Sequence, residues 1–189
     1  MISYLHCYSN SRPSVDWNTC GQAAIATISD YWGRNPYGLA RTARDPYNSL
    51  YYWNDGQAID AIKNHGYGPD VVFGWGTTGG RVRDALRSYG LGASVGYSGW
   101  FSWGWQNLWS TLQLYLQYNR PVPVLVDLGK LNGPAFGAHW AIAYRMTSST
   151  IKLGNMDYRW NSNPSHNDFL AAWQCWFLPY SFNHCAVYC

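Results

Sequence analysis

Apolar residues recur at helical spacing along the first two thirds of the chain. Between Gln22 and Trp32 they repeat every three or four residues, and Gly33 follows as the kind of residue that ends a helix. Capping residues and similar spacing predict three more helices, at residues 55–66, 81–89 and 102–117. A short apolar run at residues 71–75 predicts a strand, whereas the polar segment at residues 1–19 predicts a loop.

After residue 121 the pattern changes from helical spacing to alternation. β-rich runs predict three antiparallel strands, at residues 122–128, 139–146 and 150–153. Pro121 and Pro123 indicate that the first of these lies at a sheet edge or begins at the prolines. The tail, residues 159–189, reads as loops with one further strand at 173–178. Helices first and strands later predict a single α+β domain over residues 1–189.

The composition narrows the class of protein. Aromatic residues make up 18% of the 189 and charged residues only 12%, which excludes a disordered, highly charged chain. The net charge of +3 comes from scattered basic residues that form no run, so we expect no nucleic-acid partner. No stretch approaches about 20 apolar residues, so we expect no membrane-spanning helix. We further expect a monomer that needs no cofactor.

The chain has five cysteines, Cys7, Cys20, Cys175, Cys185 and Cys189. An odd number suggests one free thiol beside two pairs. No signal peptide is visible, so the protein is either cytosolic or numbered from after a removed leader. The cysteines and the low Lys and Glu content favour a secreted protein with at least one disulfide that pins the C-terminal tail. The alternative is a cytosolic protein with reduced thiols.

Cys20 is the strongest candidate for chemistry. It follows a polar loop and stands at the first turn of the predicted helix. The N-terminal amides and the dipole of a helix stabilise a thiolate, which makes a cysteine there more nucleophilic. Gly21, directly after it, allows another group to approach closely. The alternative interpretations of Cys20 are a small buried residue and one half of a disulfide.

A nucleophilic thiol also needs a base, and His139 fits that role. It begins a predicted strand directly after a glycine-rich loop, residues 133–137, which we expect to place it at the mouth of a cleft. A third residue should orient its imidazole. Asn155 and Asp157 follow the strand that pairs with the histidine strand, and the hairpin returns the chain to the level of His139 there. The alternatives are a core histidine and a pair of turn residues.

Four segments around these positions carry a family resemblance. In chain order they are Asn18-Thr19-Cys20-Gly21-Gln22-Ala23-Ala24-Ile25-Ala26, the Trp- and Leu-rich stretch 103–117 with Asn119-Arg120-Pro121-Val122-Pro123-Val124 after it, His139-Trp140-Ala141-Ile142-Ala143-Tyr144, and Leu153-Gly154-Asn155-Met156-Asp157. In type, order and spacing they resemble the papain-like C39 and C39-like cysteine peptidases. The resemblance covers about residues 14–158.

The resemblance implies a papain-like α+β fold in which the helix that carries Cys20 packs on an antiparallel sheet. It also implies a cysteine peptidase that hydrolyses peptide bonds in a peptide or protein substrate through a thioester. Cys20 attacks the carbonyl, His139 transfers the proton, and either Asn155 or Asp157 holds the imidazole.

The oxyanion hole is where the chain departs from the family. The family usually has a Gln six residues before the nucleophile, whose amide helps to form this hole. Ser14 occupies that position here, so the expected donor is Ser14 itself, Asn18 or Asn10. Losing one such donor typically costs about 3–4 kcal/mol in barrier height.

Two other functions fit the same residues or the same fold. An acyltransferase or amidase would form the same thioester. A catalytically weak papain-like module would instead bind peptides or glycans in an aromatic cleft, to which residues 97–105 could contribute. His184, Cys185 and Cys189 have a spacing seen at metal sites, but no partner pair is obvious, so we expect no metal.

Overall fold

The computed structural model describes residues 2, 5–8, 18–35, 38–41, 43–44, 51–71, 74, 76–98, 104–135, 137–177, 180–181 and 183–189. It divides the chain into two compact units. The N-terminal unit is His6–Gly92, and the C-terminal unit is Ala93–Cys189 together with Met1–Leu5. The expectation of one domain over residues 1–189 stays a prediction.

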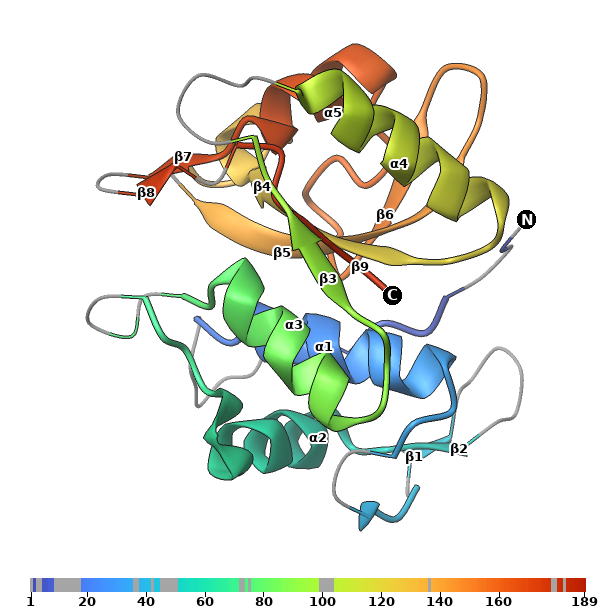
Figure 1. Ribbon diagram of the computed structural model, residues 1–189, viewed down its shortest axis with the longest axis vertical. Coiled ribbons are helices and arrows are strands. Elements are labelled where there is room, and N and C mark those ends of the chain that lie inside the picture. The colour runs from blue at the N-terminus through green and yellow to red at the C-terminus, as the bar shows by residue number, and fades with distance from the viewer. Residues whose placement is uncertain are drawn as a thin grey trace. The chain divides into compact units, whose positions relative to one another are not determined.

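Helices are the longest elements in the described part of the N-terminal unit (Figure 1). Its elements are α1 (Cys20–Tyr31), β1 (Ala43–Arg44), β2 (Tyr51–Tyr52), α2 (Asp55–Ile62), the π-helical turn η2 (Lys63–Tyr67) and α3 (Gly79–Ser88). The two short strands pair antiparallel. The helices predicted in this part of the chain are confirmed, with ends shifted by a few residues.

Side chains at the helix starts explain those shifts. Asn54, not Asp55, caps α2, because its side chain accepts hydrogen bonds from the Gly56 and Gln57 amides. Thr78 caps α3 by accepting from the Arg81 amide at 3.2 Å, which starts that helix two residues before the predicted position. Both caps satisfy amides that the first helical turn otherwise leaves without a partner.

The strand predicted at residues 71–75 is wrong for the two residues of that range that the structure describes, Val71 and Gly74. The Gly74 amide donates to the Val71 carbonyl at 2.7 Å, and the Asp70 and Val71 amides both donate to the Gly76 carbonyl. The amides of the described residues therefore bond within the segment and not to a neighbouring strand, and Gly74 has a positive φ, 69°, outside the range of a strand.

The core of the N-terminal unit forms where α1 packs against both α2 and α3. Ten of the twelve residues of α1 are buried. The apolar residues buried in this unit's helices are Ala23, Ala24, Ile25, Ala26, Ile28, Ala58, Ile59, Ile62, Val82, Ala85 and Leu86. The small side chains of the alanines allow neighbouring segments to pack closely against α1. Residues on more than one face of this helix are therefore buried.

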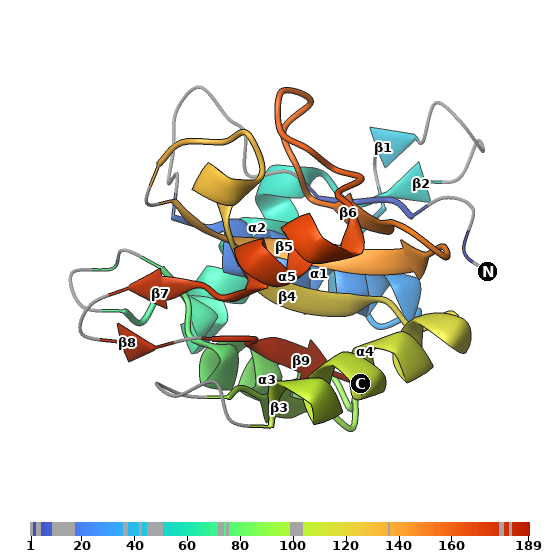
Figure 2. The ribbon, with the colours of Figure 1, turned by 90° about the horizontal axis from the view of Figure 1, so that it is seen from above.

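The C-terminal unit is built on a five-stranded antiparallel sheet (Figures 1 and 2). Its elements are β3 (Ser94–Gly96), α4 (Trp105–Gln117), β4 (Val122–Asp127), the 3₁₀ turn η4 (Leu128–Lys130), β5 (Ala138–Met146), β6 (Ile151–Gly154), α5 (His166–Trp173), β7 (Trp176–Phe177), β8 (Tyr180–Ser181) and β9 (Ala186–Tyr188). The sheet order is β3-β9-β4-β5-β6, and β7 pairs with β8 separately. In both views α4 and α5 cover the same face of the sheet.

A single apolar cluster joins that face to the two helices. It contains Leu112 and Leu116 from α4, Val122, Val124 and Val126 from β4, Ala141 and Ala143 from β5, Phe169 and Trp173 from α5, and Ala186 and Tyr188 from β9. The alternate valines of β4 are the pattern expected of a strand with one face on a helical layer. This cluster is what fixes the register of β4 and β5.

Of the two positions that the prolines allowed for the first predicted strand, the structure confirms the strand start. β4 begins at Val122, directly after Pro121, and it lies inside the sheet and not at its edge. Its registered pairing with β9 is limited to Val124 and Ala186.

The tail contains helix α5, which was not predicted and ends at Trp173. The strand predicted at residues 173–178 is confirmed at Trp176–Phe177, as β7. The last strand, β9, was not predicted.

Among the described residues, no helix combines the length and the apolar character needed to cross a lipid bilayer.

Candidate active site

Cys20 is the first residue of α1 and is buried. The preceding residue, Thr19, makes no side-chain cap, and the first turn of α1 has no acidic residue. Within α1 itself, the positive end of the helix dipole therefore acts on the thiol with no carboxylate in the same turn to offset it. The dipole favours a thiolate at this position, whereas burial of the side chain opposes it.

The two residues after Cys20 hold α1 against the start of α3. A Cβ added to Gly21 would lie 2.5 Å from the Thr77 Cβ, so only glycine leaves room for Thr77. Gln22 is fully buried, and its Nε2 donates to the Tyr67 carbonyl at 2.7 Å and to the Thr77 hydroxyl at 3.1 Å. The close approach expected at Gly21 is therefore made by a side chain of the same unit.

The predicted oxyanion donors are only partly described. Ser14 and Asn10 lie outside the described residues. Asn18 is described, and its side-chain amide donates to the Gly74 carbonyl. One of its two amide hydrogens is therefore used within the N-terminal unit, and its role as an oxyanion donor stays a prediction.

His139 lies near the start of β5, where it pairs with Val126 of β4. Its side chain is buried, and its Nε2 lies 2.5 Å from the main-chain carbonyl oxygen of Asn155, to which it donates a hydrogen bond. Burial lowers the pKa of His139 to about 4, because the charged imidazolium loses water, and this exceeds the opposite effect of the Asn155 carbonyl. At neutral pH the imidazole is therefore uncharged, with the proton on Nε2 and a lone pair on Nδ1.

Asn155 reaches His139 through its main chain. It follows β6 with a φ of 59°, a left-handed conformation that asparagine adopts more readily than most residues. Its side-chain amide donates to the Trp140 carbonyl at 2.8 Å, which fixes the turn against β5. The hairpin does return the chain to the level of His139, and the group that it presents there is the carbonyl oxygen of Asn155.

Asp157 is engaged elsewhere. Its two carboxylate oxygens accept hydrogen bonds from the Arg159 guanidinium at 2.9 and 3.0 Å, and one also accepts from the Arg159 amide. These bonds lower the pKa of Asp157 to about 2. Of the two residues predicted as the third member of the site, the structure joins Asn155 to His139 and joins Asp157 to Arg159.

Trp160 also contributes to the surroundings of His139, and sequence reasoning missed it. Its ring meets the imidazole edge-on, with 5.2 Å between ring centres. The indole is one of the groups that pack against the buried imidazole. Trp160 lies in a stretch that reads as loop, and no spacing rule connects it with His139.

The remaining cysteines provide neither a disulfide nor a metal site. All five lie among the described residues, and no disulfide joins them, so the predicted disulfide is not supported. Burial raises the pKa of the Cys185 thiol to about 12, which keeps it protonated. Within the part of the chain that the structure describes, no three His, Cys, Asp or Glu side chains gather in a metal-binding arrangement.

Comparison with known structures finds a similar fold. The chain is similar to the peptidase domain of Streptococcus ComA, a bi-functional ABC transporter involved in a quorum-sensing pathway; the match covers 93% of each chain, with a TM-score of 0.54 and 16% sequence identity. A likeness at this identity shows a shared fold, and it confirms the predicted α+β class. No protein-family model and no curated protein matches the chain.

Proposed function

We propose that the protein is a cysteine peptidase in which Cys20 is the nucleophile, His139 the base and Asn155 the residue that orients the base. The observation that carries the proposal is the buried imidazole of His139, whose Nε2 hydrogen is held by the Asn155 carbonyl. That bond selects the tautomer with a basic Nδ1. The fold, similar to that of a peptidase domain, and the position of Cys20 at a helix start support it further.

The proposed reaction has two halves. His139 Nδ1 takes the thiol proton of Cys20, and the sulfur attacks the carbonyl carbon of the scissile peptide bond. As the tetrahedral intermediate breaks down, the same Nδ1 returns the proton to the leaving amine, and a thioester remains on Cys20. Water then attacks the thioester with His139 again as base, which releases the acid and restores the thiol.

The oxyanion of each intermediate needs donors. In the proposal these are the Cys20 main-chain amide at the start of α1 and a side chain from Ser14 or Asn18. Asn18 would use the amide hydrogen that does not bond to Gly74. The substrate is a peptide or protein, and the protein acts as a monomer.

Reactivity of the thiol provides the first test. We expect iodoacetamide to alkylate Cys20 faster than any other cysteine, and the rate at Cys20 to fall at least tenfold in His139→Ala. Cys185→Ala is the matched control, because that thiol is buried and protonated. Equal rates in wild type and His139→Ala would contradict the pairing of the two residues.

Products distinguish peptidase from acyltransferase. Internally quenched peptides incubated with the enzyme should give two fragments with free ends, and Cys20→Ala should give none. If fragments appear only when an amine acceptor is added, and one fragment carries that amine, the protein is an acyltransferase. If thiol alkylation is fast but no peptide is cut, the peptidase proposal fails.

An extracytoplasmic location remains a proposal, and the structure contains no disulfide to support it. The argument from cysteines for secretion can be tested by counting free thiols in denatured, unreduced protein. Three or fewer free thiols would indicate at least one disulfide and support secretion, whereas five would remove that argument.

A further inference from the structure

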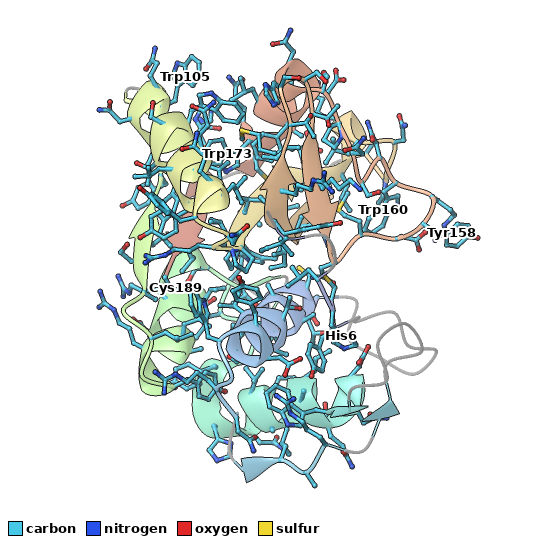
Figure 3. The ribbon with its side chains drawn as sticks, turned by 90° about the vertical axis from the view of Figure 1, so that its right-hand side faces the viewer. His6, Trp105, Tyr158, Trp160, Trp173 and Cys189 are labelled. Atoms are coloured by element: carbon cyan, nitrogen blue, oxygen red, sulfur yellow. The ribbon has the colours of Figure 1, made fainter. Side chains whose placement is uncertain are left out.

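A second buried histidine, His184, lies just before β9 in the C-terminal unit, and the proposed reaction does not use it. Its imidazole stacks on the ring of Trp105, at the start of α4, with 5.9 Å between ring centres. It also meets the ring of Trp173, at the end of α5, edge-on at 5.2 Å. Figure 3 shows Trp173 in the interior of the unit and Trp105 nearer its surface. The imidazole is therefore enclosed by two large aromatic side chains.

The main chain at His184 is held in an unfavourable conformation. Its φ of 54° is left-handed, which residues other than glycine rarely adopt. Hydrogen bonds from three directions hold residues 183–185 there. The Ser98 amide donates to the Asn183 carbonyl at 2.9 Å, the His184 amide to the Trp173 carbonyl at 2.8 Å, and both the Leu125 amide and the Trp173 indole to the Cys185 carbonyl, at 3.0 and 2.9 Å. These bonds attach the segment to the chain after β3, to α5 and to β4, and β9 follows it directly.

The hydrogen bonds of the imidazole suit its neutral form. Its Nδ1 lies 2.8 Å from the Ser98 hydroxyl oxygen, which itself lies 3.2 Å from the Asn183 carbonyl oxygen. With the proton on Nδ1, the ring donates to Ser98 and Ser98 donates to the carbonyl, so both hydrogens have an acceptor. Nε2 is buried, and no described residue bonds to it. The neutral ring leaves only a lone pair there, whereas the charged ring would leave an N–H without an acceptor among the described residues.

Among the described residues, no carboxylate faces the ring to offset a positive charge. Helix α4 contains no charged residue, and Asp168 lies in the first turn of α5, whereas Trp173 is the last residue of that helix. Asp127, which ends β4, accepts a main-chain amide of the turn that follows it. The adjoining Cys185 thiol is protonated, because burial raises its pKa to about 12. Burial also lowers the pKa of His184, with no contribution from a charged group.

We propose that His184 is a protonation switch for β9: in mild acid the imidazole takes up a proton, residues 183–185 leave their partners, and β9 separates from β3 and β4. The face of Trp105 attracts a cation, but it lies nearly parallel to the imidazole and so accepts nothing from an N–H in the imidazole plane. Departure gives Nε2 access to water and relieves the left-handed conformation. β4 then keeps only its pairing with β5, the strand that carries His139.

Hydrogen exchange followed by NMR between pH 7 and pH 5 tests the switch in the wild type. The Trp173 indole and the Leu125 amide both donate to the Cys185 carbonyl, so their protection reports the attachment of the segment. After correction for intrinsic rates, we expect both to lose protection about tenfold for each pH unit below about 6.5, because opening takes up one proton. The Leu153 amide of β6 is the internal reference and should lose little. Ring 15N shifts should show His184 neutral, with its proton on Nδ1, in the folded protein.

Two variants separate His184 from other titrating groups. His184→Asn removes the titrating ring and keeps a residue that tolerates the left-handed conformation, so the protection of the Trp173 indole should no longer depend on pH. His166→Asn is the matched control and should keep the wild-type dependence. His166 is half-buried and contacts Trp109 of α4, but its Nε2 already has a partner, the Thr150 carbonyl at 3.3 Å.

Three results would overturn the inference. An equal loss of protection at Leu153 would mean that acid opens the whole unit and not β9. A His184 ring that becomes protonated near pH 6.5, with full protection at Trp173 and Leu125, would mean that the folded protein accommodates the charge. A pH dependence that persists in His184→Asn would assign the effect to another group. The first two results come from the wild type, so they decide the matter even if the variant does not fold.

Discussion

The surroundings of Cys20 and of His139 are constructed in different ways. In the N-terminal unit, side chains hold the segment after Cys20: Thr77 fits against Gly21, and Gln22 bonds to both Tyr67 and Thr77. In the C-terminal unit, the Asn155 carbonyl holds His139, and the pairing of β5 with β6, which ends at Ile142 and Gly154, leads the chain into the turn that carries this carbonyl. The first arrangement depends on which residues are present, whereas the second depends mainly on the path of the main chain.

This difference explains what substitution should do to each region. A change of side chain near Cys20 removes a contact directly. Near His139, a substitution acts only if it alters the backbone conformation that carries the carbonyl, or the hydration of the imidazole. The four changes that follow test this distinction.

Acidification should have the largest effect, and it acts through His139. The unfolded chain binds a proton on this residue below about pH 6.5, but the folded protein does so only near pH 4. Stability should therefore fall as the pH falls through this window, by roughly 3 kcal/mol for a shift of this size. Urea unfolding at pH 7 and pH 4 measures the loss, and His139→Gln should show a loss smaller by about that amount. An equal loss in both proteins would mean that His139 is hydrated.

Gly21→Ala should be next in size, because its methyl group would overlap the Thr77 side chain. Overpacking of this kind costs about 1–3 kcal/mol in the free energy of unfolding. In a Thr77→Gly background the same change should cost much less, since the side chain that it meets is gone. A double-mutant cycle measured by urea unfolding gives the coupling, and additive effects would show that Thr77 is not the obstacle.

Asn155 offers a smaller and more informative pair of variants. Asn155→Gly keeps the left-handed conformation and loses the bond to the Trp140 carbonyl, which is worth about 1 kcal/mol. Asn155→Ala loses that bond and adds about 1 kcal/mol of backbone strain. We expect the alkylation rate of Cys20 to follow the same order, with Asn155→Ala slower. A slower rate in the glycine variant would show that the Asn155 side chain acts on His139 directly.

Asp157→Ala should have the smallest effect. Its partner Arg159 is an exposed side chain, and water screens ion pairs of this kind so that they add little to stability. We expect a free energy of unfolding indistinguishable from that of the wild type and an unchanged rate of Cys20 alkylation. Should this variant lose reactivity while Asn155→Ala keeps it, Asp157 would be the orienting residue after all.

The sequence predicts Cys20 and His139 but does not choose the third residue of the candidate site. The reason is again that side chains can be read from a sequence and main-chain contacts cannot. Cys20 was recognisable because a helix start with a glycine after the cysteine is a local pattern. His139 followed from the start of an alternating strand. The choice between Asn155 and Asp157 could not be made, because a main-chain carbonyl is common to every residue and leaves no trace in the sequence. Only the register of β5 and β6, with an irregularity between Ala143 and Arg145, decides which carbonyl faces the imidazole.

For the fold as well, elements defined by local sequence patterns are predicted better than elements that depend on pairing with distant segments. Helices with their own periodicity were predicted to within a few residues. Helix α5 is not among the predicted helices, although Ser165 and Asp168 form a capping pair at its start, which is a local sequence signal for a helix. Strands β3 and β9 are three residues each, too short for alternation to show, and they form because each completes a sheet made by distant segments.

The place of β9 between β3 and β4 has a consequence for the kinetics of folding. Its pairing with β3 joins residues about ninety positions apart, so this part of the sheet has a high contact order. Ordering so long a loop costs entropy before any of the pairing is gained, which makes β9 a late addition. Until it arrives, β3 and β4 each present an unpaired edge. Refolding should therefore pass through a slow phase in which aggregation competes with completion of the sheet.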